Sequence, residues 1–596
     1  MQASLARPAP RESANKAWLR ALSLTARIEK EPERVLSEVV EAQALAQPDA
    51  PALLADDQRF TYAELALRAR RYGRWALANG LEKGDAVAVV ASNRPEYLAA
   101  WLGLTAVGVV VALINTNLRG DALVHSLAAA SPRHVIASPE LAEPARAAAA
   151  RLPAPPAFDV LDRGPGGLLA AIDALPSQRL TPAERRGVTV NDTALLIYTS
   201  GTTGLPKAAR VSHRRVMSWS AWFAGMLDAG PADRLYDCLP MYHSVGGVVA
   251  TGALLVGGGS VVIAPKFSAG RFWDDIRRWD CTLFQYIGEL CRYLLSAPAD
   301  ARDKDHHLRI ACGNGLSGAV WTPFQERFAI PRILEFYAAT EGNFSLFNAE
   351  GEPGAIGRVP GFMAHRFPAA LVAFDPLTGA PARGADGFCV RCRPGEAGEA
   401  IGRIEASGDP AHRFEGYTSA AETEKKVLRD VFERGDAWLR TGDLMRIDER
   451  GFFRFVERIG DTFRWKGENV STGEVASVIE SCPGVSAASV YGVTVPGAEG
   501  RAGMAAIVKG SGFDLGVLHA ELASRLPAYA RPMFLRLTPA LAFTETFKRT
   551  TGRLAAEGFD PAKMTDRLYF DDPRAGGYVP LDAGLFAEIA QGGVRL

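Results

Sequence analysis

The stretch that decides the fold is YTSGTTGLPK, residues 198–207, which directly follows an apolar run ending at Ile197. Backbone N–H groups and hydroxyls on a glycine-containing turn can surround phosphate oxygens, and Lys207 adds a positive charge. The pattern differs from the Walker A loop, in which Ser or Thr follows the lysine. The candidate phosphate-binding residues are Tyr198, Thr199, Ser200, Gly201, Thr202, Thr203, Gly204 and Lys207. Because such turns are more often ordinary loops, this interpretation needs support from the rest of the chain.

Around this stretch, short apolar runs alternate with helical patterns. The runs typical of buried strands are residues 86–90, 134–137, 194–198, 260–263 and 333–337. Residues 64–77 have the spacing of an amphipathic helix. An order of strand, helix and strand predicts a mostly parallel sheet that is covered by helices.

The pattern of predicted elements changes toward the C-terminus. Residues 384–454 consist of short, turn-rich segments, which predict a β-rich subdomain. Beyond residue 458, strand patterns at 488–493 and 505–508 are followed by a helical pattern at 514–526. We therefore predict an α/β fold with a large N-terminal body of several subdomains, containing parallel sheets and a β-rich part, and a small α+β C-terminal domain.

One segment tests whether the chain spans a membrane. Residues 97–114 contain no charge over 18 positions, which touches the lower length limit of a spanning helix. Gly108 interrupts the segment, and the β-branched residues after it favour a buried strand that follows a buried helix. Residues 18–28 are apolar with interspersed arginines, and we expect them to pack against the body rather than on a membrane surface.

Composition excludes several classes of protein. The 596 residues carry 67 Lys+Arg and 67 Asp+Glu, so no excess positive charge favours a nucleic acid partner.

Seven cysteines are too few for a disulfide framework and indicate a reducing compartment. Cys389 and Cys392 form a lone CxxC pair with no second ligand pair, which argues against zinc. The N-terminus has no continuous apolar core typical of a secretory signal. We expect a cytoplasmic protein.

Three further motifs follow the stretch at 198–207 in a fixed order. They are the segment Gly313-Asn314-Gly315-Leu316, the segment Tyr337-Ala338-Ala339-Thr340-Glu341-Gly342, and Thr441-Gly442-Asp443 with Arg458. An aromatic face, an acceptor pair for a ribose diol and a carboxylate for a metal are what an adenine nucleotide requires. Tyr337, Asp443 and Glu341 are of those chemical types.

Together these motifs resemble the adenylate-forming superfamily, which includes acyl-CoA synthetases, luciferases and the adenylation domains of peptide synthetases. The resemblance implies that Gly313, Asn314 and Gly315 form the adenine wall. It implies that Tyr337 stacks on adenine and that Thr340 contacts the α-phosphate. The remaining roles that it implies are Mg²⁺ binding for Glu341 and ribose binding for Asp443 and Arg458.

Two segments indicate a branch of that superfamily. DTFRWKGENVST, residues 461–472, and LPMYHSVGG, residues 239–247, are similar to fatty acid transport proteins and very-long-chain acyl-CoA synthetases. The resemblance places His243 near the acyl carboxylate, with Gly246 and Gly247 leaving room for the chain. Two interpretations of Trp219, Trp222 and Phe223 stay open, a wall of an acyl tunnel and plain core.

The chain departs from the superfamily pattern at several positions. Ala338 stands where glycine is usual, and Gly460 stands at the hinge where Asp or Lys is common. Asn469 replaces an arginine of the superfamily, so no CoA contact is carried over for it. Lys548, in the segment Thr546-Phe547-Lys548, corresponds to the adenylation lysine. The resemblance implies a body at residues 1–457 and a mobile domain at 458–596, which rotates about the hinge.

The resemblance implies an ATP-dependent long-chain or very-long-chain fatty acid:CoA ligase. The acid would attack the α-phosphorus of ATP with Mg²⁺, and coenzyme A would then displace AMP. The catalytic residues expected on this basis are Lys548, Glu341, Thr340 and His243. A ligase for an aryl or sterol side-chain acid, and a non-catalytic fatty acid uptake protein, stay open as alternatives. A homodimer, and peripheral association with the inner face of a membrane, also stay open.

Overall fold

The computed structural model describes residues 13–164, 166–200, 206–375, 378–405, 413–459, 462–465, 468–496, 498, 500–541 and 551–594. The chain divides into two compact units. The large unit comprises residues 1–369, 401–441 and 451–453, and the small unit comprises residues 370–400, 442–450 and 454–596.

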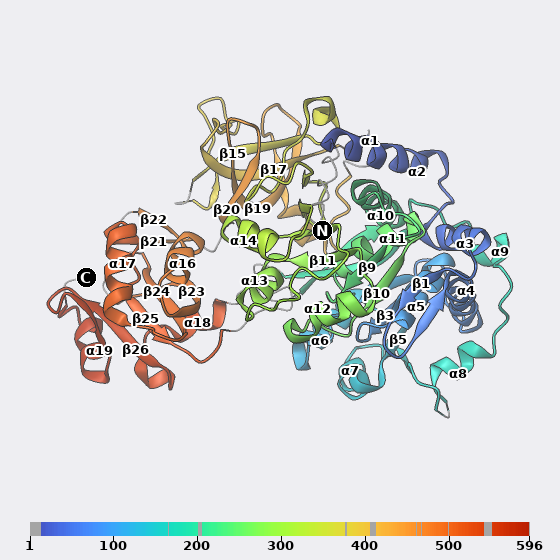
Figure 1. Ribbon diagram of the computed structural model, residues 1–596, viewed down its shortest axis with the longest axis horizontal. Coiled ribbons are helices and arrows are strands. Elements are labelled where there is room, and N and C mark those ends of the chain that lie inside the picture. The colour runs from blue at the N-terminus through green and yellow to red at the C-terminus, as the bar shows by residue number, and fades with distance from the viewer. Residues whose placement is uncertain are drawn as a thin grey trace, which may run out of the picture. The chain divides into compact units, whose positions relative to one another are not determined.

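Two sheets form the large unit (Figure 1). The first sheet runs in the order β14 (Ser345–Asn348), β13 (Ile333–Ala338), β12 (Ile310–Asn314), β11 (Leu283–Ile287), β9 (Arg234–Asp237), β10 (Ser260–Ile263), β1 (Pro51–Leu54), β2 (Arg59–Thr61). The second runs in the order β6 (Ala157–Val160), β5 (His134–Ala137), β3 (Ala86–Val90), β4 (Val110–Leu113), β7 (Thr193–Ser200), β8 (Pro206–Ser212). Neighbouring strands are parallel except for β14, β2 and β8. The predicted parallel sheets are confirmed.

Alternate residues along the strands face different layers of helices, because side chains in a strand point to opposite faces in turn. In β10, Val261 belongs to the central core, whereas Val262 belongs to the outer cluster of the first sheet. In β4, Val111 belongs to the same central core, and Ala112 belongs to the outer cluster of the second sheet. The two sheets therefore face each other across a shared helical layer.

The helices can be assigned to layers by the buried cluster to which each contributes. The central layer contains α1 (Ala14–Thr25), α3 (Leu36–Ala46), α4 (Tyr62–Ala78), α5 (Pro95–Ala106), α8 (Leu168–Asp173), α10 (His213–Leu227) and α11 (Thr251–Gly257). The outer layers contain α12 (Ala269–Arg278), α13 (Gly288–Ser296) and α14 (Gly318–Arg327) on the first sheet, and α6 (Gly120–Ala130) and α7 (Ala142–Ala149) on the second. Short helices α2 (Arg27–Lys30), α9 (Pro182–Arg185) and α15 (Ala420–Glu424) lie in connections.

The uncharged segment 97–114 is a buried helix and a buried strand. All residues of α5 and β4 are buried, and Gly108 turns the chain between them with φ +84°. In the described part of the chain, no helix has both the length and the apolar character needed to span a membrane. In α1, Trp18 packs edge-on against Trp222 at 5.5 Å and Phe367 at 5.6 Å, so the interpretation of residues 18–28 as a packed segment is confirmed.

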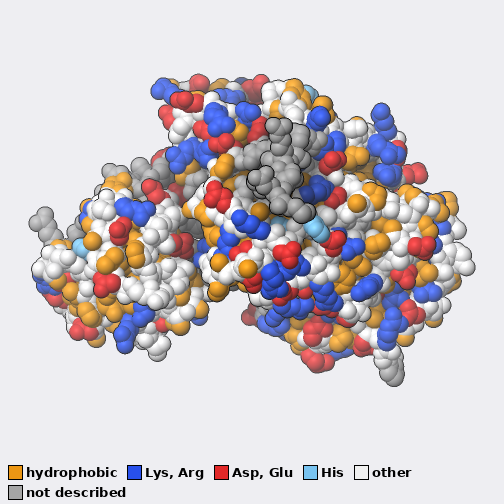
Figure 2. Space-filling model, viewed as in Figure 1, with side chains coloured by type: hydrophobic (Ala, Val, Ile, Leu, Met, Phe, Trp, Pro, Cys, Tyr) orange, Lys and Arg blue, Asp and Glu red, His pale blue; other side chains and the backbone are white. Residues whose placement is uncertain are grey.

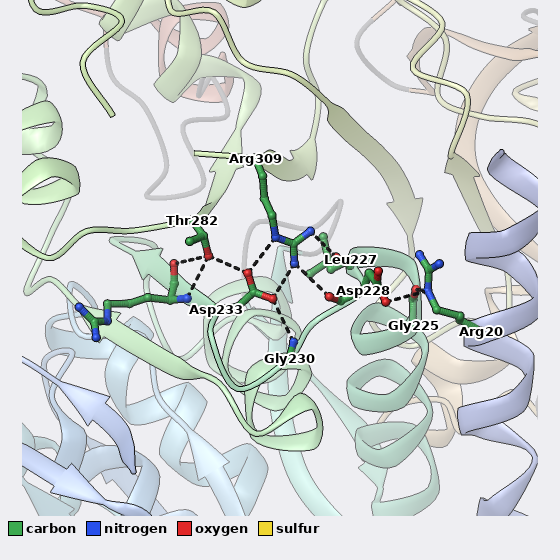
Figure 3. A network of polar contacts seen from close by, with 9 residues as sticks. Arg20, Gly225, Leu227, Asp228, Gly230, Asp233, Thr282 and Arg309 are labelled. Carbon is green, nitrogen blue, oxygen red and sulfur yellow. Dashed lines mark hydrogen bonds and ion pairs between the residues drawn. The ribbon is translucent and has the colours of Figure 1, made fainter. Parts of the chain in front are cut away.

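A guanidinium group ties the first sheet to the end of α10. Arg309, directly before β12, donates hydrogen bonds to the carbonyls of Leu227 and Asp228 at 2.8 and 3.1 Å and to Asp233 (Figure 3). The last carbonyls of a helix have no partner within the helix, and a cation is favourable there. Arg20 of α1 pairs with Asp228 at 3.1 Å. Arg309 and Arg20 thus fasten α10 to its neighbours.

The β-rich subdomain is confirmed as a six-stranded sheet, whose strands carry residues of both units. Its order is β16 (Ala380–Pro381), β15 (Ala369–Asp375), β17 (Ala397–Ile404), β19 (Ala437–Ile447), β18 (Val427–Arg429), with β20 (Phe453–Arg458) paired to β19.

On the molecular face in Figure 2, positive and negative side chains are intermixed, as expected from a chain without net charge.

The rest of the small unit is the predicted α+β domain. Its sheet runs β23 (Val485–Val493), β24 (Ala502–Lys509), β25 (Phe534–Leu537), β26 (Arg567–Asp572), β27 (Gly577–Pro580), and its other elements are hairpin strands β21 (Thr462–Trp465) and β22 (Glu468–Ser471) and helices α16 (Thr472–Glu480), α17 (Leu515–Arg525), α18 (Gly552–Glu557) and α19 (Ala583–Ala590). Phe463 and Trp465 of the hairpin are buried in its core. Strands β26 and β27, which sequence patterns did not predict, complete the sheet.

Candidate active site

The phosphate-loop stretch lies on an antiparallel hairpin of the large unit. Strand β7 carries Thr199 and Ser200 opposite Lys207 and Pro206 of β8. Thr199 and Lys207 therefore lie side by side, one position before the last pair, at the end of the hairpin where residues 201–205 join the two strands. The side chain of Ser200, and the residues Gly201, Thr202, Thr203 and Gly204, lie outside the part that the structure describes.

Tyr198 has a packing position on this hairpin. Only 5% of its surface is exposed, and its hydroxyl donates a hydrogen bond of 2.6 Å to the carbonyl of Ser126 in α6. Burial raises the pKa of Tyr198. Its ring belongs to the outer cluster beneath α6 and α7. Tyr198 therefore anchors the hairpin to its covering helix, a role that differs from the phosphate contact expected from the motif.

Glu341, the expected metal ligand, is held by two residues that sequence patterns did not single out. Glu341 is 7% exposed, and its carboxylate accepts a hydrogen bond of 2.7 Å from the hydroxyl of Tyr417. The ammonium of Lys426 lies 3.7 Å from the same oxygen. Mg²⁺ is usually bound by one or two carboxylates together with substrate phosphates, so a single oriented carboxylate fits this ion. Among the described residues there is no cluster of three or more metal-ligating side chains.

Tyr417 also connects Glu341 to the hairpin. The backbone of Tyr417 forms an antiparallel bridge with Ala209 of β8, and the ammonium of Lys207 lies 6.0 Å from the centre of the Tyr417 ring. Burial and the neighbouring Glu341 raise the pKa of Tyr417, so the phenol keeps its proton and acts as a donor. Lys207, an expected phosphate-binding residue, and Glu341, the expected metal ligand, are therefore brought together around Tyr417.

Lys207 has a carboxylate partner. It forms an ion pair with Glu422 of α15, and Lys425 pairs with the same carboxylate at 2.6 Å. Hydrogen bonds from Lys207 and then Lys425 lower the pKa of Glu422 to about 2. Glu422 thus balances the charge of Lys207 and fixes its direction.

Arg215 positions the loop that contains Thr340. This buried guanidinium donates to the carbonyl of Thr340 at 2.9 Å and to the carbonyl of Arg413 at 3.0 Å. Glu415, 3.7 Å from the guanidinium, accepts hydrogen bonds from the backbone and hydroxyl of Ser212 at 2.7 and 2.6 Å. Ser212 in turn caps α10. The start of α10 therefore fixes both the Thr340 loop and the segment that leads to Tyr417.

The segment around His243 lies beside Thr340. The hydroxyls of Ser244 and Thr340 are 3.3 Å apart, and the ring of His243 packs on that of Tyr242 at 4.6 Å. Ser244 precedes a π-helix, η2 (Val245–Ala250). Such π-helical turns are frequent at functional sites.

Gly246 and Gly247 have a different role from the one expected. A Cβ atom on Gly246 would lie 2.7 Å from the Pro240 carbonyl oxygen, and one on Gly247 would lie 1.9 Å from the Met241 carbonyl oxygen. The space that these glycines leave is filled by backbone, so it is not free for an acyl chain. They allow η2 to pack closely on the preceding segment.

The aromatic residues of α10 divide between two environments. Trp222 and Phe223 are buried in the central core, where both pack against Phe347 at 5.4 and 5.7 Å. Trp219 is partly buried, with the Arg215 guanidinium 6.0 Å from its ring centre. Trp222 and Phe223 are therefore core residues, as the second of the two interpretations predicted.

The expected adenine slot lies at neighbouring strand ends. Gly313 and Asn314 end β12, and Gly315 turns the chain with φ +79°, a conformation that favours glycine. Tyr337, near the end of adjacent β13, is half-buried and packs edge-on against Phe344 at 5.5 Å. Ligands of open α/β sheets bind outside the carboxyl ends of parallel strands. These residues occupy such an edge.

The expected ribose-binding residues meet in the small unit. Arg458 donates a hydrogen bond of 2.9 Å to the buried carboxylate of Asp443. The backbone N–H of Gly442 donates to Glu399 at 3.3 Å. The expected hinge residue Gly460 and the expected adenylation lysine Lys548 lie outside the described residues.

Comparisons with known proteins identify the family of the chain. The family model described as "AMP-binding enzyme" matches residues 40–387, and that described as "AMP-binding enzyme C-terminal domain" matches residues 474–548. The chain belongs to the AMP-binding enzyme family. The resemblance to adenylate-forming enzymes is thereby confirmed.

Two relatives place this AMP-binding enzyme in a narrower group. Long-chain fatty acid transport protein 1 of Mus musculus is 42% identical over 94% of this chain and 88% of its own length. Long-chain fatty acid transport protein 3 of Homo sapiens is 40% identical over 87% and 76%. The chain is thus similar over most of its length to the branch that residues 239–247 and 461–472 indicated.

A solved structure confirms the fold class. The crystal structure of ATP-bound MatB from Rhodopseudomonas palustris matches with a TM-score of 0.74 and 26% identity, covering 87% of this chain and 98% of that chain.

Proposed function

We propose that this AMP-binding enzyme is an ATP-dependent fatty acid:CoA ligase for long-chain or very-long-chain acids. It joins the acid to AMP, releases pyrophosphate, and then transfers the acyl group to coenzyme A. The observation that carries the proposal is the position of Tyr417, whose hydroxyl donates to Glu341 and whose backbone is paired with Ala209 of hairpin strand β8. The relatives named as long-chain fatty acid transport proteins support the class of acid, and the ATP-bound neighbour supports the nucleotide.

In the first half-reaction, the fatty carboxylate attacks the α-phosphorus of ATP. No general base is needed, because a carboxylate is ionised near pH 7. Negative charge on the phosphate oxygens needs stabilisation, and preorganised donors and cations are effective for this. Thr199, Thr340 and Lys207 supply such groups from the large unit. Mg²⁺, when bound, withdraws charge from the phosphates, and Glu341 is its protein ligand in this proposal.

In the second half-reaction, the CoA thiol attacks the acyl carbonyl and AMP leaves. We place the domain boundary at residues 457 and 458 and the hinge at Gly460. Rotation there withdraws Lys548 after adenylation, so that one small domain serves both steps. Asp443 and Arg458 hold the ribose, and Tyr337 faces the adenine. His243 lies next to the acyl carboxylate. The cytoplasmic location, peripheral membrane contact and a homodimer stay predictions from the sequence.

The test is a pyrophosphate-release assay with ATP, Mg²⁺, CoA and acids of graded chain length. We expect acid-dependent pyrophosphate release with the highest kcat/KM for long chains, because each buried CH₂ contributes about 0.8 kcal/mol of transfer free energy. A preference for aryl or sterol side-chain acids would change the substrate class. Absence of ATP consumption with every acid, under conditions where the protein binds fatty acid, would favour an uptake protein without turnover.

A further inference from the structure

A buried carboxyl group lies beneath the adenine slot and has no place in the steps above. Glu335 is in β13, two residues before Tyr337, and only 4% of its surface is exposed. No ion pair to Glu335 occurs among the described residues, and the titratable side chains that face it are Tyr286, Cys291 and Cys312. A carboxyl group in such surroundings is costly unless its oxygens are hydrogen-bonded.

Both oxygens of Glu335 are hydrogen-bonded. The hydroxyl of Tyr286 donates to one oxygen at 2.5 Å, and the backbone N–H of Leu316 donates to the other at 3.1 Å. Glu335 therefore binds the turn that follows Gly313 and Asn314, the predicted adenine wall.

The three central strands explain how this contact forms. Gly313 of β12 is paired with Tyr286 of β11 on one side and with Glu335 of β13 on the other. A Cβ atom on Gly313 would lie 2.5 Å from Cδ2 of Tyr286. The missing side chain of Gly313 lets the Tyr286 ring pass over β12 and reach Glu335.

The same turn is packed from a second side. A Cβ atom on Gly288, the first residue of α13, would lie 1.8 Å from the carbonyl oxygen of Gly315. The backbone of α13 thus touches the turn directly. Glu335 beneath the turn and Gly288 beside it leave the segment 313–316 little freedom.

We propose that Glu335 is a positioning residue for adenine: it fixes the 313–316 turn at a set distance from Tyr337, which is carried by the same strand. This inference rests on the proposed function, because it takes segment 313–316 and Tyr337 as the adenine slot. Glu335 contacts no reacting atom. Its effect is on the affinity for the adenosine part of the nucleotide and not on the phosphates.

The protonation state of Glu335 guides the choice of variant. Burial raises its pKa to about 8, so near neutral pH the protonated form is well populated. A protonated carboxyl group can donate to the Tyr286 oxygen while its other oxygen still accepts from Leu316. Glutamine has an N–H donor and a carbonyl in the same places, so Glu335→Gln keeps the hydrogen bonds to Tyr286 and Leu316. Glu335→Leu removes both of them.

The experiment measures AMP binding by calorimetry, and the KM for ATP with the product inhibition constant of pyrophosphate, on the full chain. We expect Glu335→Leu to weaken AMP binding and raise the KM for ATP by about tenfold, as loss of partners for buried polar groups predicts. The pyrophosphate constant should stay unchanged. Glu335→Gln should restore AMP affinity, and Tyr286→Phe, which lacks only the hydroxyl, should give an intermediate loss.

Ile333→Ala is the matched control, because Ile333 is buried on the same strand and face. It should lower the melting temperature without weakening AMP binding. Equal AMP affinity in Glu335→Leu and the wild type, equal losses for AMP and pyrophosphate, or a glutamine variant no better than leucine would overturn the inference. A wild type that binds AMP but never turns over ATP would contradict the proposed function and leave the AMP comparison decisive for Glu335.

Discussion

Glu341→Ala is expected to lower the rate of magnesium-dependent pyrophosphate release by about 10²–10³-fold, the loss typical of removing one preorganised electrostatic group. The carboxylate is buried and oriented by Tyr417 and Lys426. Alanine would remove the proposed metal ligand and leave the cation of Lys426 without this partner. The measurement is single-turnover pyrophosphate release at several Mg²⁺ concentrations.

The control for this variant is Glu326→Ala, at an exposed glutamate of α14 in the same unit. It should release pyrophosphate at the wild-type rate. A concentration of Mg²⁺ that restores Glu341→Ala would show weakened metal binding, as the account expects. An unchanged rate at low Mg²⁺ would mean that another residue holds the ion.

Lys548→Ala is expected to separate the two half-reactions. In the proposed mechanism this lysine neutralises charge at the α-phosphate and serves adenylation alone, so its loss should reduce acid-dependent pyrophosphate release by about 10²–10³-fold. Transfer of the acyl group from supplied acyl-adenylate to CoA should keep the wild-type rate, because the proposed domain rotation withdraws this residue before that step. The two rates are measured separately on the same preparation.

Arg553→Ala provides the comparison for Lys548→Ala. Arg553 is a cation five positions after Lys548 in the sequence. Its side chain is 74% exposed and lies 3.4 Å from Glu557, and its loss should leave both rates intact. Equal reductions of adenylation and thioester formation in Lys548→Ala would contradict the assignment of Lys548 as the adenylation lysine. A larger loss of adenylation in Arg553→Ala would transfer the role to that arginine.

Local sequence patterns correctly predicted strands whose two faces are both covered by helices. The runs at 86–90, 134–137 and 260–263 coincide with β3, β5 and β10, because continuous β-branched and aliphatic residues suit strands covered by two helical layers. The segment 97–114 was correctly divided because Gly108 provides the positive φ that its turn requires.

The partners of the site residues could not be predicted in this way. Tyr417 lies 76 positions from Glu341 in the sequence, and no local period connects a tyrosine in a loop to a carboxylate at a strand end. The environment of Glu335 likewise depends on register across three strands. A motif match also gave Tyr198 and Gly246 ligand-related roles, whereas the structure gives them packing contacts.

The central claim is that the acid is joined to AMP before any thiol is involved. Its most direct test is exchange of labelled pyrophosphate into ATP with a long-chain acid and Mg²⁺ but no CoA. We expect exchange that depends on the acid and that falls by about 10²–10³-fold in Glu341→Ala. Exchange that requires CoA, or turnover that releases ADP and phosphate in place of AMP and pyrophosphate, would contradict it.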